Sequence, residues 1–139
     1  MKVIPYSASA GITGFESPAS EYMQLPMNLD ELLVAHPSST FIGRACGDSM
    51  QAAGIFDGDI LIVDRHVDHK NMDVIVGNFN GEFVCKIIDM YTRRLISANE
   101  SYAPIYISEH DTFTIEGVVT SSIRLHRPSY LLSSNQCTL

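Results

Sequence analysis

The sequence has 139 residues, of which 45% are hydrophobic and 18% are charged, a composition typical of one globular domain and not of a disordered chain. Its net charge of −7 argues against unaided binding to nucleic acid, because phosphate contacts need clustered Lys and Arg. There is no membrane-length apolar run and no signal-like apolar region at the N-terminus, so we expect a cytoplasmic protein without membrane contact.

Residues 1–36 are predicted to form an extended, flexible N-terminal arm. Residues 7–19 are rich in Ser, Ala, Gly and Pro and have no sustained period of 2 or 3.6. Residues 28–34 are compatible with one or two helical turns capped by Asn28 or Asp30. The His36-Pro37 step then ends the helical pattern, because the residue before a proline disfavours the helical region.

Residues 37–128 are predicted to form a mainly β domain, and the polar residues 129–139 a C-terminal tail. The apolar run 60–63 is typical of a strand buried on both faces. Asn80-Gly81 predicts a type I′ turn, which both residues suit because they accept a positive φ. Further strands are predicted at 40–45, 73–79, 82–88, 94–98 and 112–119.

A serine in a tight turn is the first candidate catalytic residue. Ser49 stands in the turn 47–50, which is predicted to lead into a short helical segment at 51–53. A hydroxyl at such a junction is exposed, and the backbone N–H groups of Asp48 and Ser49 beside it could hold an oxyanion. Gly-Asp-Ser is also a common turn, so Ser49 taken alone is better explained as an ordinary turn residue.

Lys86 is the second candidate, in the second arm of the predicted hairpin. Side chains alternate along a strand, so Lys86 shares its face with Val84 and Ile88. Burial between aliphatic side chains lowers the pKa of a lysine, and a neutral amine can take the proton of a serine hydroxyl. The alternative is a lysine whose stem crosses apolar surface while its ammonium reaches water, and periodicity alone favours that alternative.

The other polar residues indicate neither a metal nor a cofactor. Cys46, Cys85 and Cys137 lack C-x-x-C spacing, and the scattered histidines offer no obvious catalytic base. Asp57 and Asp59 flank a glycine before an apolar strand, which is typical of a turn and not of a metal site. We therefore expect no metal and no cofactor.

Several phrases of the sequence match one known family in their order and spacing. They are GFESPASEY at 14–22, HPSST at 36–40, GDSM at 47–50, DGDILIVD at 57–64, GEFVCK at 81–86, NESYAPI at 99–105 and GVVT at 117–120. The chain resembles the UmuD accessory subunits of the error-prone polymerase V system, including plasmid-borne relatives, which are similar to the peptidase domain of LexA-type repressors. The resemblance implies a LexA/UmuD C-terminal-domain-like twisted antiparallel β fold with a flexible N-terminal arm.

The resemblance also implies a function. Ser49 would be the nucleophile and Lys86 the general base, 37 residues apart as in the family. The family cuts one bond in its own arm when a RecA–single-stranded-DNA filament is present. The processed homodimer then acts with a UmuC-like polymerase subunit in SOS mutagenesis and translesion DNA synthesis. DNA contact would come from these partners, which suits the acidic charge of the chain.

Two bonds are candidates for cleavage. The family cuts before the glycine of Gly-Phe-x-Ser-Pro-Ala, which is Gly14 here, but the usual small preceding residue is replaced by β-branched Thr13. Ala10-Gly11 offers a small residue in a register shifted by three. Register favours Thr13-Gly14, because it fixes how the arm reaches the cleft. A second departure is Cys46, where relatives often have serine.

Two rival classes stand beside a self-cleaving Ser-Lys peptidase, and a third, a repressor, is not expected. A non-enzymatic β-rich protein-interaction module would carry Ser49 and Lys86 as ordinary residues. A signal-peptidase-like enzyme also uses Ser and Lys on a related β scaffold, but it needs a membrane anchor, which we do not find in the sequence. A LexA-like repressor needs an N-terminal DNA-binding domain, and we expect the residues before Gly14 to be too few for one.

Overall fold

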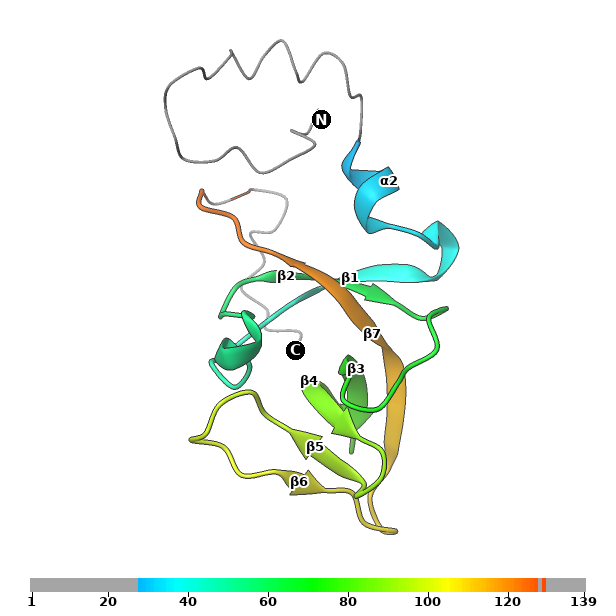
Figure 1. The fold of residues 1–139 in the computed structure, drawn as a ribbon, viewed down its shortest axis with the longest axis vertical. Helices are drawn as coiled ribbons and strands as arrows, with labels where there is room; N and C mark the ends of the chain where they lie inside the picture. The colour runs from blue at the N-terminus through cyan, green and yellow to red at the C-terminus, as the bar shows by residue number, and fades with distance from the viewer. Residues whose placement is uncertain (1–27, 128, 130–139) are drawn as a thin grey trace, which may run out of the picture. The chain divides into compact units, whose positions relative to one another are not determined.

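The computed structural model of the chain describes residues 28–127 and residue 129 (Figure 1). Both candidate scissile bonds, most of the predicted arm and almost all of the predicted tail lie outside the described residues, and the predicted domain boundaries stay predictions. Helix α2 (Leu29–Leu33) belongs to a unit separate from the one that begins at His36. Its N-cap is Asn28, whose side-chain oxygen accepts a hydrogen bond from the Glu31 N–H at 2.7 Å, which confirms the predicted helical turns.

Within the described residues, seven antiparallel strands form one sheet in the order β1-β2-β7-β3-β4-β5-β6. Two 3-10 turns, η1 (Pro37–Ser39) and η2 (Gln51–Ala53), precede β1 and follow it. The mainly β, antiparallel fold class is therefore confirmed. The strands are β1 (Thr40–Arg44), β2 (Ile60–Asp64), β3 (Val74–Phe79), β4 (Glu82–Asp89), β5 (Arg94–Ile96), β6 (Ile105–Tyr106) and β7 (Phe113–Ile123).

Strand β7 extends beyond its predicted end and joins two parts of the sheet. It pairs with β3 through its first half and with β2 through its second, as the long orange strand of Figure 1 shows. A register shift interrupts each pairing, at Val76/Gly77 against β3 and at Ile62/Val63 against β2. Such bulges bend a strand and increase its twist, so one strand follows both partners. The second half is polar, which is why its pattern did not predict a strand.

The sheet carries a hydrophobic cluster on each face. Neighbouring residues of β3, Ile75 and Val76, belong to different clusters, as the alternation of side chains requires. The first cluster consists of Ala45, Met50, Ile55, Leu61, Val63, Val76 and Cys85, and the second of Ile75, Ile88, Leu95 and Val118. In β2, Leu61, Ile62 and Val63 are all buried, which confirms a strand covered on both faces. None of the helices in the described part of the chain is long and apolar enough to span a membrane.

The hairpin of β3 and β4 is closed by the predicted two-residue turn. Phe79 pairs with Glu82, and the turn residues Asn80 and Gly81 have φ values of 52° and 90°. Positive φ at both central positions defines the type I′ turn, whose twist matches that of the flanking strands. The turn fixes the register of β4 and therefore the face on which each of its side chains lies.

We expect Gly81→Val to destabilise the domain by about 1–3 kcal/mol, because a β-branched residue is strained at a φ of 90°. The urea midpoint of the purified chain measures this loss. Gly81→Asn is the matched control and should cost less, since asparagine accepts a positive φ more readily than a β-branched residue does. Equal midpoints for the parent and Gly81→Val would contradict the role given to the turn.

Candidate active site

Ser49 lies in a loop that is fixed on both of its sides. Before it, Gly47 has a φ of 87°, and its N–H donates a hydrogen bond to a carboxylate oxygen of Asp57 at 2.7 Å. After it, Met50 is buried in the first hydrophobic cluster and precedes η2. The predicted turn leading into a short helical segment is therefore confirmed.

Lys86 lies on β4 between residues that pack on opposite faces of the sheet. Val84 and Ile88 pack in the second cluster, as alternation predicts, while Cys85 is buried in the first. Cys85 therefore shares its cluster with Met50, the neighbour of Ser49. One packed cluster thus holds both the strand that carries Lys86 and the loop that carries Ser49.

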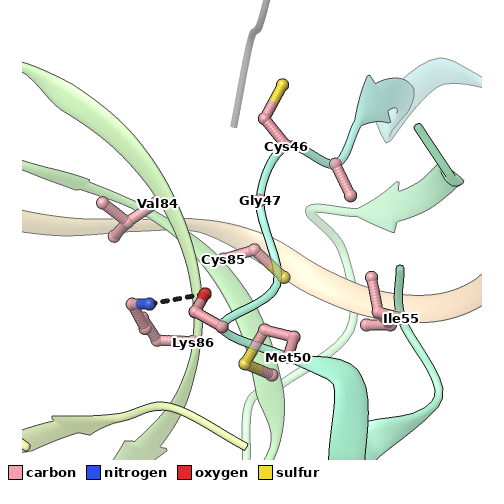
Figure 2. A pocket seen from close by; sticks show the side chains of 9 residues that line it. Cys46, Gly47, Met50, Ile55, Val84, Cys85 and Lys86 are labelled. Atoms are coloured by element: carbon pink, nitrogen blue, oxygen red, sulfur yellow. Dashed lines mark hydrogen bonds between the residues drawn. The ribbon is translucent and has the colours of Figure 1, made fainter. Parts of the chain in front are cut away.

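The structure brings Lys86 and Ser49 into direct contact (Figure 2). The Lys86 Nζ donates a hydrogen bond to Ser49 Oγ at 2.8 Å, although the two residues are 37 positions apart in the chain. A second hydrogen bond from Nζ reaches Ser97 Oγ at 2.9 Å. The amine is therefore held between two hydroxyl groups, one from the loop and one that follows β5.

Burial lowers the pKa of the Lys86 amine below that of an ordinary lysine. A thiolate at Cys85 would oppose this effect. Burial, however, raises the pKa of the Cys85 thiol to about 11, so the thiol stays neutral over most of the range in which an amine titrates. The environment therefore favours the neutral amine, the form that can accept a proton.

A cavity of about 140 Å³ lies beside the Lys86–Ser49 pair. Its lining residues are Ala45, Cys46, Gly47, Ser49, Met50, Ile55, Val84, Cys85 and Lys86. Next to it, residues 82–86 of β4 pair with β3 but with no second strand within the described residues, because β5 pairs only with residues 87–89. An open strand edge offers backbone hydrogen bonds to an extended peptide, so a chain segment can lie here with a side chain in the cavity.

The backbone N–H groups of Asp48 and Ser49 donate no hydrogen bond to any residue in the described part of the chain. Two free N–H groups beside the half-buried Ser49 hydroxyl are suited to hold a developing oxyanion. The structure therefore leaves these two groups available, and their role as an oxyanion hole stays a prediction.

Three polar residues at the pair were not singled out from the sequence. They are Ser97, Asn99 and Tyr102, of which Asn99 donates through Nδ2 to the Asp48 carbonyl oxygen at 2.8 Å, and Tyr102 donates through its hydroxyl to the Asp48 carboxylate. Ser97 could have been found from pairing, because Ile87 lies opposite Ile96, so Lys86 would meet the next residue along.

The Asp57-Gly58-Asp59 turn makes contacts that stabilise the fold. Asp57 accepts the Gly47 N–H, and the buried Asp59 pairs with Arg124, whose Nε lies 2.9 Å from its Oδ1. The hydrogen bond from Arg124 lowers the pKa of Asp59. Within residues 28–127 and 129, no three His, Cys, Asp or Glu side chains are grouped as a metal site.

The chain is similar to known proteins over most of its length. A family model described as "Peptidase S24-like" matches residues 2–120. The chain is 34% identical to Protein MucA of Salmonella typhimurium over 125 residues, which cover 88% of this chain and 86% of MucA. It is also 34% identical to Protein SamA of S. typhimurium strain LT2 over 115 residues, covering 82% and 80% of the two chains. Protein ImpA of S. typhimurium is 32% identical over 128 residues, covering 90% and 86%.

A match over most of the chain, with a Ser–Lys pair on a β scaffold, defines the class: the protein belongs to the Peptidase S24-like family. The similarity to MucA, SamA and ImpA over more than four fifths of the chain narrows the assignment within that family. It is a member of the UmuD family, related broadly to SOS mutagenesis.

Proposed function

We propose that this protein is a Ser-Lys peptidase that cleaves its own N-terminal arm, with Ser49 as the nucleophile and Lys86 as the general base. The observation that carries the proposal is the 2.8 Å contact between a half-buried amine and the Ser49 hydroxyl. The open edge of β4 and the adjoining cavity support it, because they offer a place for the arm.

The proposed reaction has two halves. Neutral Lys86 takes the proton of Ser49 while Oγ attacks the scissile carbonyl, and the N–H groups of Asp48 and Ser49 hold the oxyanion. The C–N bond then breaks, and the Lys86 ammonium gives its proton to the leaving amine. In the second half Lys86 takes a proton from a water molecule, whose oxygen attacks the ester carbonyl. The bond from that carbonyl carbon to Ser49 Oγ then breaks, and the Lys86 ammonium gives its proton to Oγ.

The cellular role that we propose follows from membership of the UmuD family. A RecA–single-stranded-DNA filament would stimulate cleavage, and the processed chain would act in the cytoplasm as a homodimer with a UmuC-like polymerase subunit in translesion synthesis. The net charge of −7 supports the assignment of DNA contact to these partners. No cofactor and no metal take part in the proposed reaction.

We expect the purified chain to cleave itself slowly at alkaline pH without an activator, because the neutral form of Lys86 then predominates. Intact mass before and after incubation measures the loss of the arm. Ser49→Ala, which lacks the attacking hydroxyl, should keep its full mass under the same conditions. A parent chain that stays intact at every pH, also with a RecA filament, would favour the interaction module instead.

We expect the product to begin at Gly14. A three-residue change of register would move an extended arm by about 10 Å, and a displacement of about 1 Å at a reacting atom can already cost on the order of 10²-fold in rate. The cavity of about 140 Å³ beside Ser49 has room for the side chain of Thr13. N-terminal sequencing of the product decides between Gly14 and Gly11.

Two variants sharpen this test of the scissile bond. Thr13→Ala should cleave at least as fast as the parent, because a smaller side chain enters the cavity at lower steric cost. Gly14→Lys should block cleavage, because it places a long charged side chain next to the attacked carbonyl. A product that begins at Gly11 would contradict the register argument.

A further inference from the structure

Tyr102 contacts both halves of the Lys86–Ser49 site, although the proposed reaction gives it no role. Its hydroxyl donates a hydrogen bond to Asp48 Oδ1, one residue before Ser49. Its ring centroid lies 5.7 Å from the Lys86 Nζ. One exposed side chain therefore connects the loop of the nucleophile with the amine of the base.

We propose that Tyr102 is a positioning residue for self-cleavage: its hydroxyl anchors the Ser49 loop through Asp48, and its ring holds the Lys86 amine. The inference rests on the proposed function, since it assigns a task within that same site. It is independent of which bond in the arm is cut.

The anchoring acts on the residue that offers one of the oxyanion donors. Asp48 is exposed, so its position depends on the hydrogen bonds that it makes. Its carboxylate accepts the Tyr102 hydroxyl, and its carbonyl oxygen accepts the Asn99 Nδ2 at 2.8 Å. Hydrogen bonds to a carboxylate are about twice as strong as neutral ones, so the Tyr102 contact limits rotation of the Asp48 backbone N–H. A fixed N–H is what transition-state stabilisation requires.

Two pKa shifts at the site act in compatible directions. The hydrogen bond to Asp48 raises the pKa of the Tyr102 hydroxyl, while burial lowers the pKa of Lys86. The first shift extends the pH range in which Tyr102 remains a donor, and the second extends the range in which the Lys86 amine is neutral. Both shifts favour an anchored loop beside a neutral amine.

The ring acts on the charged form of the base. A cation within about 6 Å of a ring centroid is attracted by the negative face of the ring, which favours the ammonium over the neutral amine. The other groups around the amine are the hydroxyls of Ser49 and Ser97 and, on its own strand, the neutral thiol of Cys85. The nearby Asp48 carboxylate is engaged by the Tyr102 hydroxyl. The ring thus opposes part of the lowering of the Lys86 pKa by burial.

Two substitutions at Tyr102 separate these effects. Tyr102→Phe keeps the ring and removes the hydroxyl, so we expect an unchanged Lys86 titration midpoint and a cleavage rate lower by about tenfold or more. Tyr102→Leu keeps apolar cover over the amine without an aromatic face. At a pH above the Lys86 midpoint we expect the same slower cleavage, and we expect the midpoint itself to be lower by roughly half a pH unit.

The full-length chain supports both measurements. Rates come from intact mass, and the Lys86 midpoint comes from its ¹³Cε chemical shift, with Lys70 in an exposed loop as an internal reference. Tyr91→Phe is the matched control, because Tyr91 is the most exposed large hydrophobic side chain among the described residues and its change is expected to alter neither quantity. Asp48→Ala should slow cleavage as Tyr102→Phe does. The double variant should be no slower than either single variant, because both substitutions remove the same hydrogen bond between Tyr102 and Asp48.

The outcomes separate this inference from the proposed function. A parent chain that never cleaves overturns the proposed function. In that case amide hydrogen exchange at residues 47–50 still tests the anchoring, which is supported if exchange is faster in Tyr102→Phe than in the parent. Cleavage of Tyr102→Phe at the parent rate, or additive losses in the double variant, overturns the anchoring. A Lys86 midpoint that does not change in Tyr102→Leu overturns the effect of the ring.

Discussion

Lys86→Ala and Lys86→Arg should both reduce self-cleavage by roughly 10²–10⁴-fold, the usual contribution of a general base. Alanine removes the amine that contacts Ser49 Oγ. Arginine keeps a positive charge at all accessible pH values and cannot take a proton. Intact mass over a time course at several pH values measures the loss. An arginine variant that cleaves at the parent rate would exclude a Ser-Lys mechanism.

The pH profile of self-cleavage in the parent chain shows whether the rate rises or falls as Lys86 loses its proton. Burial lowers the pKa of Lys86, so the neutral fraction, and with it the rate, should rise with pH and level off below the pH at which an exposed lysine would titrate. Lys86→Met serves as the control for folding, because it has a similar length and no charge. It should unfold at a urea concentration close to that of the parent and show no cleavage at any pH.

Gly117→Ala should destabilise the domain by on the order of 2–3 kcal/mol, although alanine adds a single methyl group. A Cβ at Gly117 would lie 2.7 Å from Val63 Cγ1 and 3.0 Å from the backbone oxygen of Asp64. Backbone cannot give way locally, because Val63 and Asp64 are paired to this same stretch of β7. The urea midpoint measures the loss.

The matched control for Gly117 is Thr114→Ala on the same strand. Thr114 is exposed, so its truncation should change the free energy of unfolding by less than about 0.5 kcal/mol. Val63 also belongs to the cluster that contains Met50 and Cys85, so Gly117→Ala should slow self-cleavage as well. A stable Gly117→Ala variant would mean that β7 moves away from β2 at little cost.

Local patterns in the sequence predicted the parts of the fold that depend on local chemistry. Asn80-Gly81 predicted its turn because few residue pairs accept two positive φ angles, and alternation placed Val84 and Ile88 together. The two-residue strand β6 could not be predicted, since its residues are exposed and, in the described part of the chain, pair only with β5. The extra length of β7 depends on its pairing with β2, which no local pattern contains.

In the candidate site, too, some residues could be predicted from the sequence and others depend on long-range pairing. Spacing and resemblance pointed to Ser49 and Lys86, and their roles stay proposals. Ser97 and Tyr102 were missed because their positions relative to Lys86 depend on the pairing of β4 with β5 and on the course of the loop that follows. Such contacts arise only when segments distant in the sequence have been placed.

The shared packing of Met50 and Cys85 has a consequence for the order of events in the life of the chain. Ser49 and Lys86 stand 37 residues apart, and the contact between them exists only once this cluster has formed. A chain that is still folding therefore has no assembled base and nucleophile with which to cut its arm. By the proposed mechanism, only a chain with a completely folded domain would be processed. A chain whose core fails to pack would retain its arm.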